Sequence, residues 1–422
     1  MNDLHWLTIK QASEAIQAGT LSPLEYTQAL ISRTEQLDPK LNAYIKFTPE
    51  RAVSDAKKAE DAIVKNKGIT PMTGIPYGLK DIIDVEGLET TAHSKILIDN
   101  ISRTNAFVTD KLDSSGGILM GKLACHEFAI GGPVFDLPFP PARNPWNINH
   151  HPGGSSSGSG TAVASGLLPA ALGTDTGGSV RNPATACGIV GMKATYGRVS
   201  KAGVIPLSFS LDHVGPMTRT VEDNALLLNA IAGYDKNDPS TEHNQKIPDF
   251  TEFLQKGVKG LRIGLIRHFY TTDLEADDEM CKAVDNAAAT FKKLGAIVEE
   301  IQVSPLSHFS SCNSIIMYCE ALSIHDKWFK TRPNDYSKHT RTRLMTGLFI
   351  KGEDYVNALR TRTKLTQEIN NEFRNVDLIM TASSMEAACR IDEPETVART
   401  YPRQARTCLL YTSPSPRDAT LS

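Results

Sequence analysis

Glycine is concentrated in one short stretch of this chain, and that concentration constrains the fold more than any other feature of the sequence. Twelve of the 30 glycines lie between Gly153 and Gly203. Because glycine has no Cβ, a backbone so rich in it usually turns sharply or comes close to a ligand. The stretch begins within a loop of proline, glycine, serine and asparagine over residues 144–160. We therefore expect a functional site here.

The segments around this stretch predict helices and strands in alternation. Helices are expected over residues 7–19, 22–37, 50–66 and 107–113, and strands over 75–85 and 117–123. Short strands and helices then alternate over 167–172, 178–186, 189–192 and 221–232. After a polar linker, a strand over 261–266, a helix over 276–294, a strand over 296–303, helices within 310–373 and a strand over 376–381 are expected. This alternation indicates an α/β layer fold with a largely buried sheet.

Composition excludes several classes of protein. Hydrophobic residues make up 40 % of the chain and charged residues 22 %, which excludes a disordered, collagen-like or coiled-coil protein. The net charge of −3 gives no general attraction to nucleic acid or to an anionic membrane. The seven cysteines are scattered without CxxC spacing, which argues against a disulfide framework or a zinc site. No signal peptide or apolar run of about 18 residues is present. We expect a cytoplasmic protein.

Two serine-bearing glycine motifs carry the chemistry of the stretch. They are GGSSSG, which begins at Gly153, and GTDTGGS, which ends at Ser179. The second motif leads into an expected helix, where unsatisfied N–H groups and the helix dipole favour an anion. A serine here could attack a carbonyl while the N–H groups of Thr176, Gly177 and Gly178 stabilise the oxyanion. Such a nucleophile also needs a base.

Other motifs with similar letters fit less well. The GSSSG sequence matches the nucleophile elbow of α/β hydrolases, but it follows a loop where that motif requires a strand. A phosphate-binding loop would need lysine in place of Ser159, and a zinc HExxH motif would need histidine in place of Ile130. A flexible Gly/Ser linker is the simplest alternative. Two such motifs framed by apolar segments disfavour it.

The glycine-rich stretch resembles the defining segment of the amidase signature family. The similarity runs from PGGSSSG to YGRVS, and GIPYGLKD upstream resembles the lysine motif of that family. RNPWN and LDHVGPMTRTVEDNALLLNAIAGYD are similar as well, so the resemblance covers residues 7–406. It implies a single α/β domain in which helices surround a twisted, mixed β-sheet.

The resemblance also implies a Ser–cis-Ser–Lys triad. In it, Ser179 is the nucleophile that forms an acyl-enzyme, Ser155 is the bridging serine with a cis peptide bond, and Lys80 is the base. Gly131 and Gly132 correspond to a family loop beside the scissile amide, so they are expected to bind substrate.

Physical chemistry is consistent with these roles and leaves two alternatives open. Lysine titrates near about 10.4, and burial in an apolar strand would lower that value enough for Lys80 to act as a base. The alternative is a strand lysine paired with Asp81 or Asp84. Arg181 could meet an acidic group of a substrate, or it could form a structural ion pair with Asp175.

The expected function is hydrolysis of a small carboxylic amide to an acid and ammonia or an amine. No metal or cofactor is required, and the expected partner is the small-molecule amide, without direct binding of nucleic acid or membrane. A homodimer is also compatible with the sequence. A protein that binds without catalysis is disfavoured because all three triad positions are retained.

The alternative function is that of the glutamine-hydrolysing component of a tRNA-dependent amidotransferase, its A subunit, which would act with partner subunits. Such subunits carry a GSSTENS-like stretch after the Glu-Phe-Ala segment, whereas residues 131–138 here read GGPVFDLP. This departure favours the stand-alone amidase.

The end of the chain does not follow the pattern of the rest. Residues 407–422, TCLLYTSPSPRDATLS, have no helical or strand period. We therefore expect a domain over residues 1–406, truncated at its C-terminus, and a non-native or disordered tail over 407–422.

Overall fold

The main β-sheet has six strands of mixed direction. The computed structural model describes residues 3–243 and 246–391. In spatial order the strands are β1 (Tyr44–Phe47), β3 (Ile118–Leu123), β2 (Pro76–Lys80), β4 (Ala170–Asp175), β6 (His213–Thr218) and β5 (Val190–Gly191). The β2 strand is parallel to β3 and β4, and the other pairs are antiparallel. Every residue of β2, β3, β4 and β6 is buried, as in a sheet covered on both faces.

The helices that cover this sheet come from the first 231 residues. They are α1 (Ile9–Gln17), α2 (Pro23–Leu41), α3 (Pro49–Val64), α4 (Phe107–Ser114), α5 (Ser157–Ala164), α6 (Arg181–Cys187) and α7 (Val221–Ile231). The Ser22 hydroxyl caps α2 by accepting from the Glu25 N–H, and Pro23 occupies the first turn. The α3, α5 and α7 helices pack on β3, β4 and β6. Short helical turns are η1 (Leu4–Trp6), η2 (Lys95–Leu97) and η3 (Glu127–Ala129).

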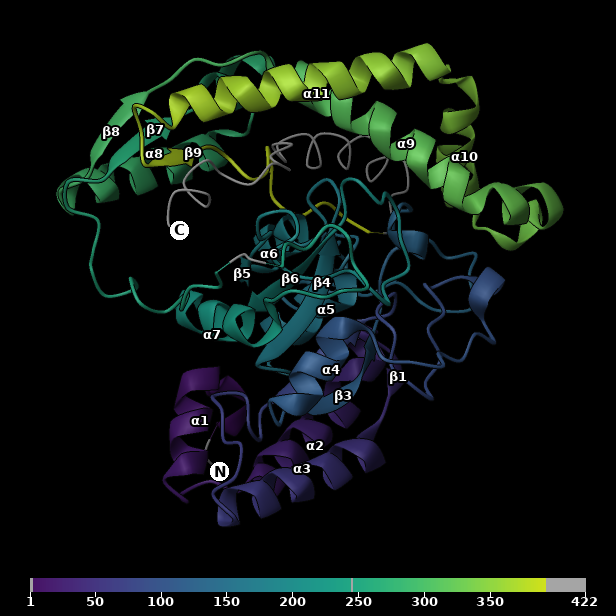
Figure 1. The fold of residues 1–422 in the computed structure, drawn as a ribbon, viewed down its shortest axis with the longest axis vertical. Helices are drawn as coiled ribbons and strands as arrows, with labels where there is room; N and C mark the ends of the chain where they lie inside the picture. Colours follow the sequence, from purple (N-terminus) through teal and green to yellow (C-terminus); the bar gives the residue numbers. More distant parts are fainter. Residues whose placement is uncertain (1–2, 244–245, 392–422) are drawn as a thin grey trace.

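The later part of the chain forms a second, smaller layer. Its parallel sheet has the order β8 (Ile297–Glu300), β7 (Arg262–Leu265), β9 (Leu378–Met380). Its helices are α8 (Asp278–Lys293), α9 (Leu306–Thr331), α10 (Lys338–Thr346) and α11 (Gly352–Glu372), with the turns η4 (Phe269–Asp273), η5 (Pro333–Asp335) and η6 (Gly347–Phe349). Figure 1 shows α9 and α11 at the opposite end of the molecule from α2 and α3.

One hydrophobic core runs through both layers. The main cluster of buried apolar residues extends from Ile9 to Met385 and includes side chains from both sheets. The protein is therefore a single α/β domain with a mixed sheet surrounded by helices, as expected. In the described ranges, none of the helices combines the length and apolar character that a membrane crossing requires.

Several element boundaries differ from the predictions. The strand expected over 75–85 ends at Lys80, because the N–H groups of Ile82 and Ile83 both turn back to the Lys80 carbonyl. The predicted loop over 144–160 contains the start of α5, and β4 runs from Ala170 to Asp175 where 167–172 was expected. The β1 and β6 strands were not predicted. The boundary at residue 406 and the tail over 407–422 lie outside the described residues.

Candidate active site

The predicted base lies where two parallel strands end side by side. Lys80 is the last residue of β2, and Thr174 and Asp175 end the neighbouring β4. The register places Leu79 opposite Leu172, so both strands deliver their C-terminal side chains to the same edge of the sheet. This edge is where open α/β sheets commonly bind ligands.

Lys80 is fully buried, and hydroxyl groups surround its nitrogen. Its Nζ lies 2.7 Å from Ser155 Oγ and 2.8 Å from Thr174 Oγ1. Burial lowers the pKa of Lys80 to about 8, and negative groups nearby oppose only part of that shift. A substantial fraction of Lys80 is therefore neutral just above neutral pH, as a general base requires.

The two carboxylates proposed as alternative partners of Lys80 are engaged elsewhere. Asp81 Oδ1 lies 2.9 Å from Lys122 Nζ, in an ion pair whose side chains are both fully buried. Asp84 accepts a hydrogen bond of 2.7 Å from the Ser102 hydroxyl. The pairing of Lys80 with either carboxylate is thus not what the structure shows.

Ser155 is held in the loop that leads into α5. The Gly154–Ser155 peptide bond is cis. The Gly154 N–H donates to Asn182 Oδ1 at 2.9 Å, and the Ser155 carbonyl accepts from the His126 N–H at 3.0 Å. Backbone contacts on both sides of this peptide therefore fix the hydroxyl that meets Lys80.

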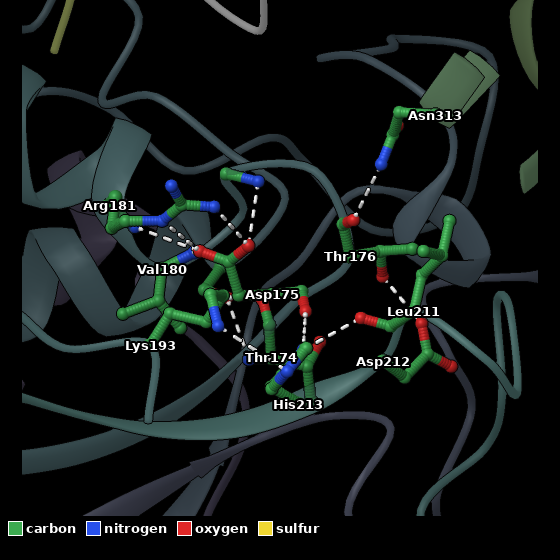
Figure 2. A network of polar contacts seen from close by, with 12 residues as sticks. Thr174, Asp175, Thr176, Val180, Arg181, Lys193, Leu211, Asp212, His213 and Asn313 are labelled. Atoms are coloured by element: carbon green, nitrogen blue, oxygen red, sulfur yellow. Dashed lines mark hydrogen bonds and ion pairs between the residues drawn. The ribbon is translucent and has the colours of Figure 1, made fainter. Parts of the chain in front are cut away.

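Ser179 lies in the turn between β4 and α6. The carboxylate of Asp175 organises this turn, as its contacts with Val180 and Arg181 in Figure 2 show. Asp175 accepts from the N–H groups of Gly178 at 2.7 Å and Val180 at 3.2 Å. Although burial acts to raise the pKa of Asp175, the Arg181 guanidinium and the Gly178 N–H hold it well below its ordinary value.

The two glycine motifs meet at Ser179. Its carbonyl accepts from the Ser156 N–H at 3.2 Å, so the loop of the bridging serine and the turn of the nucleophile are joined directly. Ser179 is 7 % exposed, in contrast to Ser155, which is fully buried. Of the two serines, only Ser179 retains some exposed surface, and its role as the nucleophile stays a prediction.

The oxyanion donors expected at this turn are not equivalent. The Gly178 N–H is already bound by Asp175, whereas within the described residues no acceptor lies against the N–H of Thr176 or Gly177. The Thr176 side chain donates to Asp212 at 2.5 Å, and its carbonyl accepts from Asn313 of α9 at 3.1 Å. These contacts hold the turn with two N–H donors still available.

Arg181 lies against Asp175 and not in open solvent. Its Nε and Nη2 donate to the two carboxylate oxygens at 3.0 and 2.9 Å, and 27 % of the side chain remains exposed. The ion pair that was the alternative for this residue is present, and a role in binding substrate stays a prediction.

Gly131 and Gly132 lie beneath the first turn of α10. A Cβ at Gly131 would come within 2.7 Å of Thr340 Oγ1, and one at Gly132 within 3.2 Å of His339 Nε2. The buried Glu127 fixes this approach, because it accepts from the Ser337 N–H at 2.9 Å. Substrate binding by the two glycines stays a prediction, with α10 as the adjoining wall.

The sequence offered no signal for several residues of this site. Asn313, His339 and Thr340 come from helices more than 130 residues beyond Ser179 along the chain, and no motif marks them. Thr174 and Asp212 could have been proposed as site residues from the sequence. Thr174 ends one apolar run and Asp212 precedes another, and both lie in segments that resemble the family. In the described ranges, no group of three or more His, Cys, Asp or Glu side chains could hold a metal ion.

Comparison with known proteins identifies the family of this chain. The profile of the Amidase family matches residues 25–417. This chain is a member of the amidase signature family. It is 39 % identical to the A subunit of glutamyl-tRNA(Gln) amidotransferase from Trichlorobacter lovleyi, over 93 % of this chain and 85 % of that protein. The corresponding protein of Geobacter sp. strain M21 is also 39 % identical, over 92 % and 84 %.

Solved structures share the whole fold. The A subunit of the glutamyl-tRNA(Gln) amidotransferase from Thermotoga maritima has a TM-score of 0.80 and 31 % identity, covering 97 % of this chain and 86 % of that one. The inhibitor-bound vestigial complex that reveals the origins of an s-triazine catabolic enzyme gives 0.86 and 31 %, with coverages of 91 % and 83 %. A protein described as an amidase gives 0.80 and 30 %, with coverages of 91 % and 83 %.

Proposed function

We propose that this chain hydrolyses the side-chain amide of glutamine at Lys80, Ser155 and Ser179 and supplies ammonia to a partner subunit. The observation that carries the chemistry is the buried Lys80 nitrogen, 2.7 Å from Ser155 Oγ with no carboxylate bonded to it in the described part of the chain. The choice of glutamine rests on the relatives, which at 35–39 % identity are A subunits of glutamyl-tRNA(Gln) amidotransferase.

The proposed reaction moves one proton along the triad in each direction. Neutral Lys80 takes the proton of Ser155, which takes that of Ser179, and the Ser179 oxygen attacks the amide carbon. The N–H groups of Thr176 and Gly177 stabilise the oxyanion. When the C–N bond breaks, the proton returns through Ser155 to the departing nitrogen, which leaves as ammonia. Water then attacks the acyl-enzyme by the same route and releases the acid.

A second candidate is an amidase that works without partners. The observation that favours it is the segment over residues 131–138, which departs from the stretch associated with amidotransferase subunits. This segment is built into the wall of the site, because Asp136 accepts from the Lys338 N–H of α10 at 2.9 Å. The fold is equally similar to a solved amidase and to a solved amidotransferase A subunit. The two candidates therefore differ in their substrate and not in their chemistry.

The test is ammonia release by the purified chain from glutamine and from a panel of aryl and aliphatic amides. Ser179→Ala should reduce release by roughly 10⁴-fold or more, because no other group can form the acyl-enzyme. Undiminished turnover in Ser179→Ala would contradict the triad.

Partner dependence separates the two candidates. Glutamine hydrolysis that rises when the other subunits of a tRNA amidotransferase are added supports the proposed function. Faster hydrolysis of aryl or aliphatic amides, with no response to those subunits, would assign the chain to the stand-alone amidases.

A further inference from the structure

Two buried histidines form a pair beside the loop of Ser155. His126 follows β3 and begins the turn η3, and His151 lies four residues before Ser155. Their Nε2 atoms are 3.2 Å apart, and their rings are stacked at 20°. One Nε2–H must donate to the lone pair of the other ring, so the two imidazoles hold opposite tautomers.

His126 touches the peptide that carries the bridging serine in two ways. Its N–H donates to the Ser155 carbonyl at 3.0 Å. Its ring occupies the space over Gly154, where a Cβ would overlap the imidazole. His126 therefore packs on this peptide with its ring and bonds to it with its backbone N–H, and both contacts limit how far the Ser155 hydroxyl can move from Lys80.

His151 anchors the other side of the pair. Its N–H donates to the Cys389 carbonyl at 2.8 Å, and its carbonyl accepts from the Asn144 side chain at 3.2 Å. The contact between the two rings therefore connects the backbone of His151, just before the glycine motif, with the backbone of His126, which follows β3. The loop between these points contains Gly153 and Gly154, which by themselves give little rigidity.

The pair is uncharged at neutral pH and lies among other basic side chains. The two side chains are 3 % and 2 % exposed, and burial lowers the pKa of His151 to about 4 and that of His126 well below its ordinary value. Besides burial, the neighbouring basic groups His151, Lys80, His339 and His93 would each oppose protonation of His126 when they are charged. The neutral pair thus fills the space beside the Gly154–Ser155 peptide, whose serine hydroxyl meets Lys80.

We infer that His126 and His151 are positioning residues, which hold the Ser155 loop in place and keep water away from the Lys80 nitrogen. This inference rests on the proposed triad, since Ser155 and Lys80 are the groups positioned. Neither histidine takes part in proton transfer.

The test follows Lys80 directly in the full chain. In protein labelled with ¹³C at the lysine Cε, the Lys80 resonance is assigned by its loss in Lys80→Met, and its titration needs no substrate. His126→Ala removes the ring beside Gly154 and lets water solvate the ammonium form. We expect the midpoint to move upward from about 8, with kcat reduced by roughly tenfold to a hundredfold and KM changed by less than about twofold.

A double variant covers the case in which His126→Ala fails to fold. His126→Leu with His151→Leu keeps apolar bulk over Gly154 and leaves no buried imidazole nitrogen without its partner. Removing both members of a buried pair costs less than removing one. We expect this variant to fold, with a Lys80 midpoint between those of the wild type and His126→Ala. Leucine replaces the ring contact over Gly154, whereas the hydrogen bond between the two imidazoles is lost.

His325→Leu is the matched control. His325 on α9 is fully buried and bonds the Tyr336 hydroxyl at 2.9 Å, so its loss should lower the thermal midpoint without moving the Lys80 titration. A Lys80 titration that stays at the wild-type position in both His126→Ala and the double variant would overturn the positioning role. A shifted titration in a chain that hydrolyses no amide would support the positioning role and count against the proposed function.

Discussion

Two lysines are buried on neighbouring strands of the main sheet, and the protein gives them different partners. Lys122 on β3 forms an ion pair with Asp81, and Lys80 at the end of β2 meets the hydroxyls of Ser155 and Thr174. Both lysine side chains are fully buried. The contrast teaches that burial alone does not produce a base. The lysine proposed as the base is the one that bonds to neutral hydroxyls, where burial favours loss of the proton.

The largest effect should come from removing the base. Lys80→Met should lower amide hydrolysis by roughly 10⁴-fold, the scale on which a triad loses activity when its base is removed. The fold should survive, because the change removes a buried amine that, among the described residues, has no counter-ion bonded to it. Steady-state turnover and a denaturant titration measure the two quantities. Comparable losses of activity in Lys80→Met and Lys122→Met at equal stability would break the distinction between the lysines.

The opposite result is expected on β3. Lys122→Met leaves the Asp81 carboxylate buried and unpaired, so the free energy of unfolding should fall by about 3–5 kcal/mol. Chemical denaturation checks this value. Asp81→Asn combined with Lys122→Met should recover part of the loss, because the stranded charge is then absent. If the single variant were as stable as wild type, Lys122 would not be the structural lysine of the pair.

The smallest expected effect, and the one most specific to Lys80, is the pH dependence of kcat/KM and of stability. The base must be neutral, and its pKa is about 8, so kcat/KM should rise by about tenfold per pH unit below that value and level off above it. The unfolded chain binds more protons than the folded one between about 8 and the ordinary lysine value of 10.5. The Lys80 contribution to stability therefore increases with pH across that window. Lys80→Met should abolish this increase, and a profile that is flat around pH 8 would assign the base elsewhere.

The residues predicted for the triad carry local sequence signals, and the structure brings them to one edge of the main sheet. An apolar segment that contains Lys80 and two glycine–serine motifs lie within about a hundred residues, although the end of the strand at Lys80 was not predicted. The same locality explains why Arg181 and Asp175, six residues apart, could be proposed as a pair. The counter-ion of Asp81 could not be found in this way, since Lys122 reaches it only through the register of β2 and β3.

The remainder of the site depends on contacts that sequence patterns do not contain. The β1 strand has only four residues, and β6 contains a proline, so neither shows a clear period. The meeting of α10 with Gly131 and Gly132 joins segments about 200 residues apart. His126 and His151 likewise could not be paired from the sequence, because only their proximity in the folded chain makes them a pair.

The buried carboxylate of Glu127 has a consequence for how this scaffold can diversify. It accepts from the Ser94 hydroxyl of the main layer at 2.6 Å and from the N–H of Ser337, the residue that caps α10, at 2.9 Å. The wall above Gly131 and Gly132 is thus attached at its base by a contact that does not involve the outward side chains of α10. Those side chains can therefore change without loss of this attachment, and if Gly131 and Gly132 bind the amide as predicted, such changes would alter the preferred amide while Lys80 and Ser155 keep their alignment.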